Sequence, residues 1–273
     1  MYRTGLVKWM PHCILNKILI AFIAFALSAC ASKDVDETEG WSESKLYSEA
    51  QSAAASRDYD KAIEYFNKLE GRAAGTMLSQ QAQLEAAYAM YKNEQKPEAI
   101  AALDRFMQNH PTSPALDYAL YLKGVVNFND DLGYFGSISK QDLSERDQQA
   151  AKASFQTFSE LVTRFPDSKY TSDARQRMVY IVNSLALSDV HIARYYYSRG
   201  AYVAAVNRAQ TAIQNYQQAP ATEEALYILY LSYTELGMPE LAADAKRVLE
   251  YNFPESEFLT KGLKKKKGLL KLW

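Results

Sequence analysis

Tyr59-Asp60-Lys61-Ala62-Ile63-Glu64-Tyr65-Phe66 is a helix-forming stretch that recurs, in altered form, four more times along this 273-residue chain. Each copy opens an expected helix and has a small residue in its first turn, which lets a second helix pack closely. The five small residues are separated by 37, 55, 51 and 37 positions: Ala62, Ala99, Ser154, Ala205 and Ala242. A repeated pair of helices is therefore predicted.

Three of the five segments end in a similar way, with a proline 12 residues after the small residue. Proline lacks a backbone N–H and interrupts a helix, so it marks the end of each unit. The three endings are Asn109-His110-Pro111, Arg164-Phe165-Pro166 and Asn252-Phe253-Pro254. The two longer spacings indicate insertions, which we place in a loop at 129–147 and in a lengthened helix at about 172–198.

A second helix is predicted before each of these segments, because apolar residues recur there at helical spacing. The expected helices are Lys45–Ser56, Gln80–Lys92, Ala115–Phe128, Ser172–Ser198 and Glu223–Leu236. No convincing strand is found from Trp41 to Pro254. The pattern resembles tetratricopeptide (TPR) repeats, in which stacked helix pairs build one continuous core. The predicted fold is an all-α solenoid of about five TPR helix-turn-helix repeats.

The N-terminal leader has the features of a secretory signal. Lys17 precedes the apolar run 18–26, which is shorter than the ~20 residues that a membrane-spanning helix needs. Leu27-Ser28-Ala29-Cys30 follows and resembles a bacterial lipobox, in which Cys30 becomes the lipidated N-terminus. The alternative is a plain signal peptide with a chance cysteine. Ala31 and Ser32 follow the cysteine. Typical Gram-negative lipoproteins that stay at the inner membrane have an aspartate there, so this sequence resembles those that are sorted to the outer membrane.

Charge and composition exclude several classes of function. The leader holds three of the 31 basic residues and none of the 32 acidic ones, so the remainder carries a net charge of −4. That balance argues against nucleic acid as a partner. No catalytic motif, metal cluster or phosphate-binding loop is present, so we predict no catalytic residue, no metal and no cofactor beyond the diacylglycerol and N-acyl chain on Cys30. Cys13 leaves with the leader, which rules out a disulfide.

Tyrosines and a lysine-rich tail remain as features with binding potential. The chain has 20 tyrosines, and at least one of Tyr195, Tyr196 and Tyr197 must face away from the core because consecutive helical residues point about 100° apart. The segment from Lys261 to Trp273 has six lysines and no acid. Such a segment either lies on an anionic surface or is solvated.

Several sequence segments together resemble the BamD family, the lipoproteins of the outer-membrane β-barrel assembly (BAM) machinery. The resemblance runs from about Lys45 to Phe253. It rests on the segments 88–92, 106–114, 133–136, 144–147, 165–170, 189–196 and 199–208. The exit of repeat one, 69–75, departs from the family pattern because it lacks the aromatic-proline turn.

The resemblance implies a non-enzymatic, essential scaffold for folding and inserting barrel proteins at the outer membrane, facing the periplasm. It implies that the C-terminal repeats bind the last POTRA domain of BamA, through Tyr195, Arg199, Tyr202 and Arg208. The N-terminal repeats are expected to receive signals of unfolded outer-membrane proteins, through Arg57, Tyr59, Tyr88 and Tyr91. Other BAM lipoproteins, and the inner leaflet of the outer membrane through the lipid anchor, complete the implied partners.

The expected organisation has five parts. They are a signal peptide at 1–29, a lipidated linker at 30–42, a substrate-binding half at 43–127, a partner-binding half at 128–258 and a lysine-rich tail at 259–273. A pilotin-like TPR lipoprotein that assists secretin or pilus assembly is the alternative function. Co-purified proteins distinguish the two, and an enzyme would require a buried polar pocket with paired titratable groups.

Overall fold

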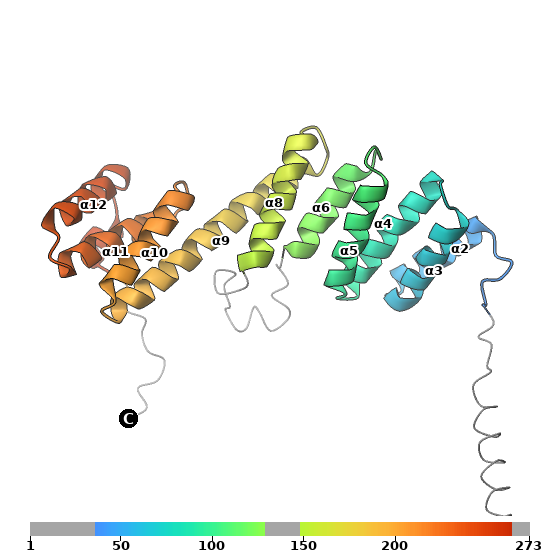
Figure 1. Cartoon of the computed structure of the whole chain (residues 1–273), viewed down its shortest axis with the longest axis horizontal. Coiled ribbons are helices and arrows are strands. Elements are labelled where there is room, and N and C mark those ends of the chain that lie inside the picture. The colour runs from blue at the N-terminus through green and yellow to red at the C-terminus, as the bar shows by residue number, and fades with distance from the viewer. Residues whose placement is uncertain (1–35, 129–147, 264–273) are drawn as a thin grey trace, which may run out of the picture. The chain divides into compact units, whose positions relative to one another are not determined.

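A computed structural model describes residues 36–128 and 148–263 (Figure 1). The described residues up to Ser42 belong to one unit, and the helices belong to a second unit that begins at Glu43. The first helices are α2 (Glu43–Ala55), α3 (Tyr59–Arg72), α4 (Met77–Lys92), α5 (Lys96–Asn109) and α6 (Leu116–Asn127). They are followed by α8 (Gln148–Arg164), α9 (Thr171–Ser198), α10 (Tyr202–Asn215), α11 (Thr222–Glu235), α12 (Pro239–Asn252) and α13 (Glu257–Lys261).

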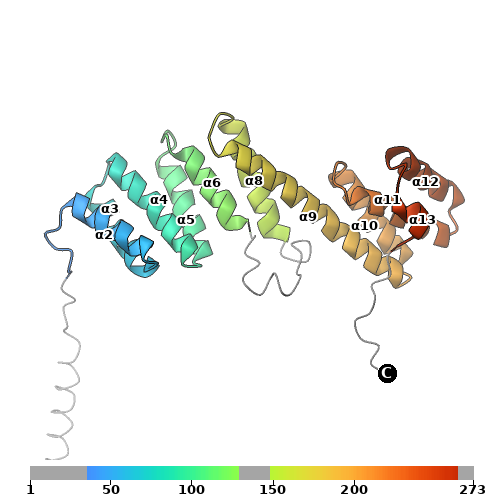
Figure 2. The ribbon, with the colours of Figure 1, turned by 180° about the vertical axis from the view of Figure 1, so that it is seen from behind.

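Each helix of the second unit from α2 to α12 packs against the helix that follows it, and the described residues contain no strand. The pairs are α2 with α3, α4 with α5, α6 with α8, α9 with α10, and α11 with α12, as Figures 1 and 2 show. The predicted all-α TPR fold is thereby confirmed. The expected first helices agree to within two residues, except that α4 begins at Met77 rather than at Gln80.

The small residues that mark the repeats lie where two helices touch. Ala62, Ala99, Ser154 and Ala205 are fully buried, and Ala242 is 6% exposed. The tightest approach is between α6 and α8, where a Cβ on Gly124 would lie 2.4 Å from the ring of Phe158. The Ser154 hydroxyl donates a 2.8 Å hydrogen bond to the Gly124 carbonyl. The close approach of α6 and α8 therefore depends on two small residues, Gly124 and Ser154.

Four of the helix pairs are joined by a turn that contains one left-handed residue. This residue is always two positions before the second helix. It is Arg57 (φ 65°), Glu94 (φ 62°), Gly200 (φ 74°) or Gly237 (φ 69°). Glycine adopts this conformation without steric cost, whereas Arg57 and Glu94 do so against their preference.

Consecutive pairs are joined by a second recurring connector, in which an aromatic residue follows the helix. The backbone N–H three positions later donates to its carbonyl. The four cases are Ser113 to His110 (3.1 Å), Ser168 to Phe165 (3.1 Å), Ala219 to Tyr216 (2.9 Å) and Ser256 to Phe253 (3.0 Å). The Tyr216 connector was not predicted, because its proline stands at 220 rather than beside the aromatic residue. The exit of repeat one keeps the same hydrogen bond, from the Thr76 N–H to the Ala73 carbonyl (3.0 Å), but has alanine in place of the aromatic residue and a left-handed Gly75 (φ 80°).

The long helix α9 belongs to two packing layers. Its first half packs through Ala174, Ile181 and Leu185 into a cluster with α6 and α8. Its second half packs through Val190 and Ala193 into a cluster with α10, α11 and α12. The predicted lengthening of this helix is confirmed, and the predicted loop 129–147 lies outside the described residues. No helix in the described ranges has the length and apolarity to span a bilayer.

The short helix α13 was not predicted. It lies against α11, where the Phe258 and Tyr227 rings stack with centroids 5.6 Å apart. It ends at Gly262, which has a φ of 69°. Part of the segment expected as a tail from residue 259 is thus folded onto the last repeat.

Candidate partner-binding surfaces

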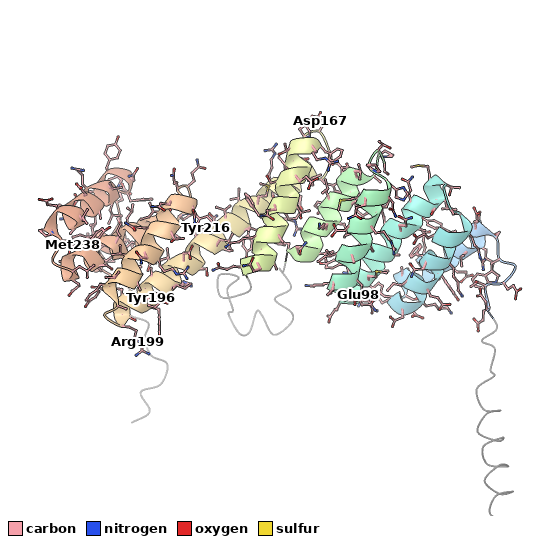
Figure 3. The ribbon with its side chains drawn as sticks, viewed as in Figure 1. Glu98, Asp167, Tyr196, Arg199, Tyr216 and Met238 are labelled. Atoms are coloured by element: carbon pink, nitrogen blue, oxygen red, sulfur yellow. The ribbon has the colours of Figure 1, made fainter. Side chains whose placement is uncertain are left out.

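The turn between α9 and α10 carries three of the four residues expected on the partner side. Tyr195 is 56% exposed, and the guanidinium of Arg199 lies 5.5 Å from the centre of its ring. Tyr202 opens α10 and packs on the ring of Tyr197, with centroids 5.6 Å apart. Figure 3 labels Arg199 at this turn, at the end of α9. An aromatic ring and a planar cation are therefore presented together.

Arg208 lies apart from that turn. It is six residues beyond Tyr202, about 9 Å along the axis of α10. Its Nη1 donates a 3.3 Å hydrogen bond to Oδ1 of Asp189 on α9. The Arg208 side chain is 45% exposed, while the Asp189 side chain is only 7% exposed. The expected set of four thus divides into a surface turn and a half-buried ion pair.

Burial raises the pKa of Asp189, and the nearby cations Arg208 and Lys152 only partly oppose that shift. Sequence reasoning missed Asp189, although an acid on the apolar side of a long helix is a usable signal. It also missed the partner of Arg194, whose guanidinium donates to both carboxylate oxygens of Glu224 on α11. This ion pair links α9 to α11, and the Glu224 side chain is only 10% exposed, so its carboxylate is largely shielded from water.

On the N-terminal side, Arg57 and Tyr59 lie at the turn between α2 and α3. Arg57 is exposed and left-handed, and Tyr59 is half-buried as the first residue of α3. The Asn93 side chain donates a 2.7 Å hydrogen bond to Asp60, so this turn lies beside the turn between α4 and α5. The structure therefore brings the turns of the first two repeats together.

Tyr88 and Tyr91 lie on the last turns of α4, with ring centroids 6.5 Å apart. Tyr88 is 39% exposed, whereas Tyr91 packs partly into the core between α4, α5 and α6. Of the four residues expected on the substrate side, Arg57 and Tyr88 are the most available to a partner. The other two are partly used by packing.

A band of aromatic and polar side chains along the first helices of repeats two to four was not predicted. Tyr121 stacks on Tyr170 at 4.6 Å and donates to Asp173. Tyr118 packs on Tyr170 at 5.5 Å, and burial, followed by the field of Glu85, raises its pKa. Burial also raises the pKa of Glu85. The recurrence of tyrosine at helical spacing in these helices was the available signal.

These surfaces have the chemistry of binding rather than of catalysis. Exposed rings and arginine forks suit partner side chains and carboxylates. No group of three or more metal-ligating side chains occurs in the ranges 36–128 and 148–263. Cys30 and Cys13 lie outside the described residues, so the structure does not bear on the predicted lipid attachment.

Comparison with known proteins identifies the family. The profile described as "YfiO: Outer membrane lipoprotein" matches residues 40–249. The "Outer membrane protein assembly factor BamD" of Neisseria meningitidis serogroup A is 48% identical over 252 residues, which cover 90% of this chain and 94% of the relative. Proteins with the same name from Pasteurella multocida and Vibrio cholerae are 37% and 32% identical, over 85% and 86% of this chain and 89% and 97% of theirs.

Proposed function

The chain belongs to the BamD family of outer membrane lipoproteins, and from that premise we propose that it binds BamA through its C-terminal repeats and barrel substrates through its N-terminal repeats. It is an outer-membrane protein assembly factor and not an enzyme. Family membership also decides against the pilotin-like alternative. The contacts with BamA and with substrates, the lipid anchor and the periplasmic orientation are what we propose.

The anchor is proposed to be Cys30, modified with a diacylglycerol and an N-acyl chain after cleavage behind Ala29. The lipobox and the description of the family as a lipoprotein support this assignment. Acyl chains anchor in proportion to the methylenes that they bury. The helical repeats would then be held at the inner leaflet, facing the periplasm, within reach of other BAM lipoproteins.

The observation that carries the BamA contact is the pairing of Arg199 with Tyr195. Their stacking orients the guanidinium at an exposed turn, and no carboxylate among the described residues forms a salt bridge with it. Its N–H donors are thus available to a carboxylate of the POTRA domain. Tyrosine beside arginine is also the composition found at energetic centres of interfaces. Tyr202 supports the turn, and Arg208 extends the surface along α10.

The substrate contact is proposed for the neighbouring turns of repeats one and two. Arg57 and Tyr88 are exposed there, and Tyr59 and Tyr91 support them. An extended peptide is bound by aromatic pockets and polar groups in such grooves. The left-handed conformation of Arg57 supports a role for its side chain, since glycine serves two of the equivalent turns at lower cost.

The test of the BamA contact is a detergent pull-down with the full chain and its Arg199→Glu variant. Arg105→Glu is the matched control, because Arg105 is also exposed but lies on α5. We expect wild type and the control to recover BamA, and Arg199→Glu to recover at least about tenfold less, as for the loss of an interface hot spot. Circular dichroism verifies that the helices persist.

Equal recovery of BamA by all three proteins would remove Arg199 from the interface. The substrate contact is tested separately, with a labelled peptide of the C-terminal strand of a barrel protein. Tyr88→Ala with Arg57→Ala should weaken its binding, and Arg199→Glu should not.

A further inference from the structure

The last repeat ends in an apolar groove of about 340 Å³. It is lined by residues of α11, of α12 and of the turn between them, where Figure 3 labels Met238. Its lining is mainly apolar, with a single lysine: Tyr230, Thr234, Met238, Ala242, Ala243 and Lys246. Comparison with an inner repeat explains why a groove lies here.

Repeat two is matched to repeat five by a constant offset of 143 residues, which relates Glu94 to Gly237 and Ser113 to Ser256. Under this offset the groove residues Tyr230, Ala242 and Lys246 correspond to Ala87, Ala99 and Leu103. In repeat two those residues are buried in one cluster against the next helix, α6, which contributes Ala119, Leu122 and Val126. The groove is therefore the place where the first helix of a sixth repeat would pack.

The helix α13 corresponds by this offset to residues 114–118, at the start of α6. It follows the same aromatic connector, through Ser256, as α6 follows through Ser113. It stops at Gly262, which corresponds to Ala119 in the middle of the first half of α6. The counterpart of the buried Leu122 is Lys265, so the helix pattern does not continue. Among the described residues, none that follows α12 lines the groove.

We propose that residues 264–273 of this chain fold back into the open groove and cap the last repeat. They contain Leu269, Leu270, Leu272 and Trp273, which match the apolar lining of the groove. The segment begins beside the last repeat, because Leu263 packs against the core cluster shared by α9, α10, α11 and α12, to which the groove residue Ala242 belongs. Ten extended residues span up to about 33 Å, which exceeds the ~21 Å length of α12.

Charge also favours this occupant. The tail carries five lysines and no acid. The segment 239–263 carries five acids and three basic residues, a net charge of −2. Its basic residues pair with Asp244, Glu250 and Glu257, so Glu240 and Glu255 provide the charge opposite to that of the tail. A tethered segment acts at a millimolar effective concentration, so a modest intrinsic affinity is enough to keep it bound.

Tryptophan fluorescence of the full chain tests the proposal. In the variant Trp9→Phe/Trp41→Phe, Trp273 is the only tryptophan left. We expect its acrylamide quenching constant to be about threefold lower than after the further change Ala243→Arg, which places bulk and positive charge in the groove. Ala101→Arg on α5 is the matched control, because Ala101 is also an exposed alanine on a second helix, and it should change nothing.

Thr234→Arg, at an exposed groove position on α11, replaces Ala243→Arg should the latter lose its helical circular dichroism. A tryptophan that is quenched freely in the starting variant overturns the proposal. So does protection that persists after both groove changes, or protection that is gained only when anionic lipid vesicles are added, since the tail then binds elsewhere. BamA is absent from this measurement, so its failure and that of the proposed function are distinguishable.

Discussion

At the scale of the residue, the junction of α9 and α10 is organised around a buried carboxylate. Asp189 is shielded from water and faces Arg208 and Lys152, yet its pKa is raised, because desolvation exceeds the attraction of the cations. Sequence reasoning found Arg208 but not this partner, which lies 19 residues away on another helix. Such a pairing depends on how the two helices pack against each other, and a sequence motif carries no information about that packing.

The raised pKa of Asp189 gives a pH dependence of defined sign. The folded protein holds the proton of Asp189 more tightly than the unfolded chain, so this group lowers the unfolding free energy as pH rises through the ordinary aspartate pKa. The difference in unfolding free energy between wild type and Asp189→Asn should therefore fall over that range. Urea titrations at several pH values measure it, and a difference that rises with pH would contradict the assignment.

Gly124 gives a second prediction at this scale. Gly124→Ala forces a methyl group against Phe158, and overpacking of this kind costs about 1–3 kcal/mol of unfolding free energy. Gly71→Ala is the control, since nothing lies within 4 Å of its Cβ position in α3. The control should stabilise by about 0.5–1 kcal/mol through helix propensity. A neutral Gly124→Ala in the same denaturation series would disprove the close approach.

At the scale of the element, the local sequence predicts the helix pairs better than it predicts the connections between them. The small residues and proline exits predicted the second helix of each pair, and the helical spacing of apolar residues predicted the first, because these signals act within one helix or one connector. The Tyr216 exit was missed since its geometry comes from the aromatic residue and not from a neighbouring proline. The helix α13 was missed because its stability comes from Tyr227 on a distant helix rather than from its five residues.

The left-handed turns provide a prediction at this scale. Gly237→Ala should lower the unfolding free energy by about 1 kcal/mol, because a Cβ is disfavoured at positive φ. Glu94→Gly at the equivalent turn relieves that cost, so it should be neutral or stabilising although glycine has a larger chain entropy to lose. Thermal denaturation of both variants is the measurement. Destabilisation by Glu94→Gly as large as that by Gly237→Ala would reject the equivalence.

At the scale of the whole molecule, a stack of helix pairs presents exposed turns at regular intervals. Function is then assigned by which turns carry exposed rings and cations, and the turns of repeats one, two and four do so. The sequence located these turns, since they follow the repeat. It did not separate Arg199 from Arg208, or Tyr88 from Tyr91, because exposure of each side chain depends on the neighbouring repeat.

Site-specific photo-crosslinking in living cells tests the central proposal, the BamA contact at the turn between α9 and α10. A photoreactive amino acid replaces Tyr195 in one strain and the exposed Met77, on α4, in another. We predict a crosslink to BamA from position 195 and none from position 77. Capture of BamA from position 77 alone, or of a different protein from position 195, would contradict it.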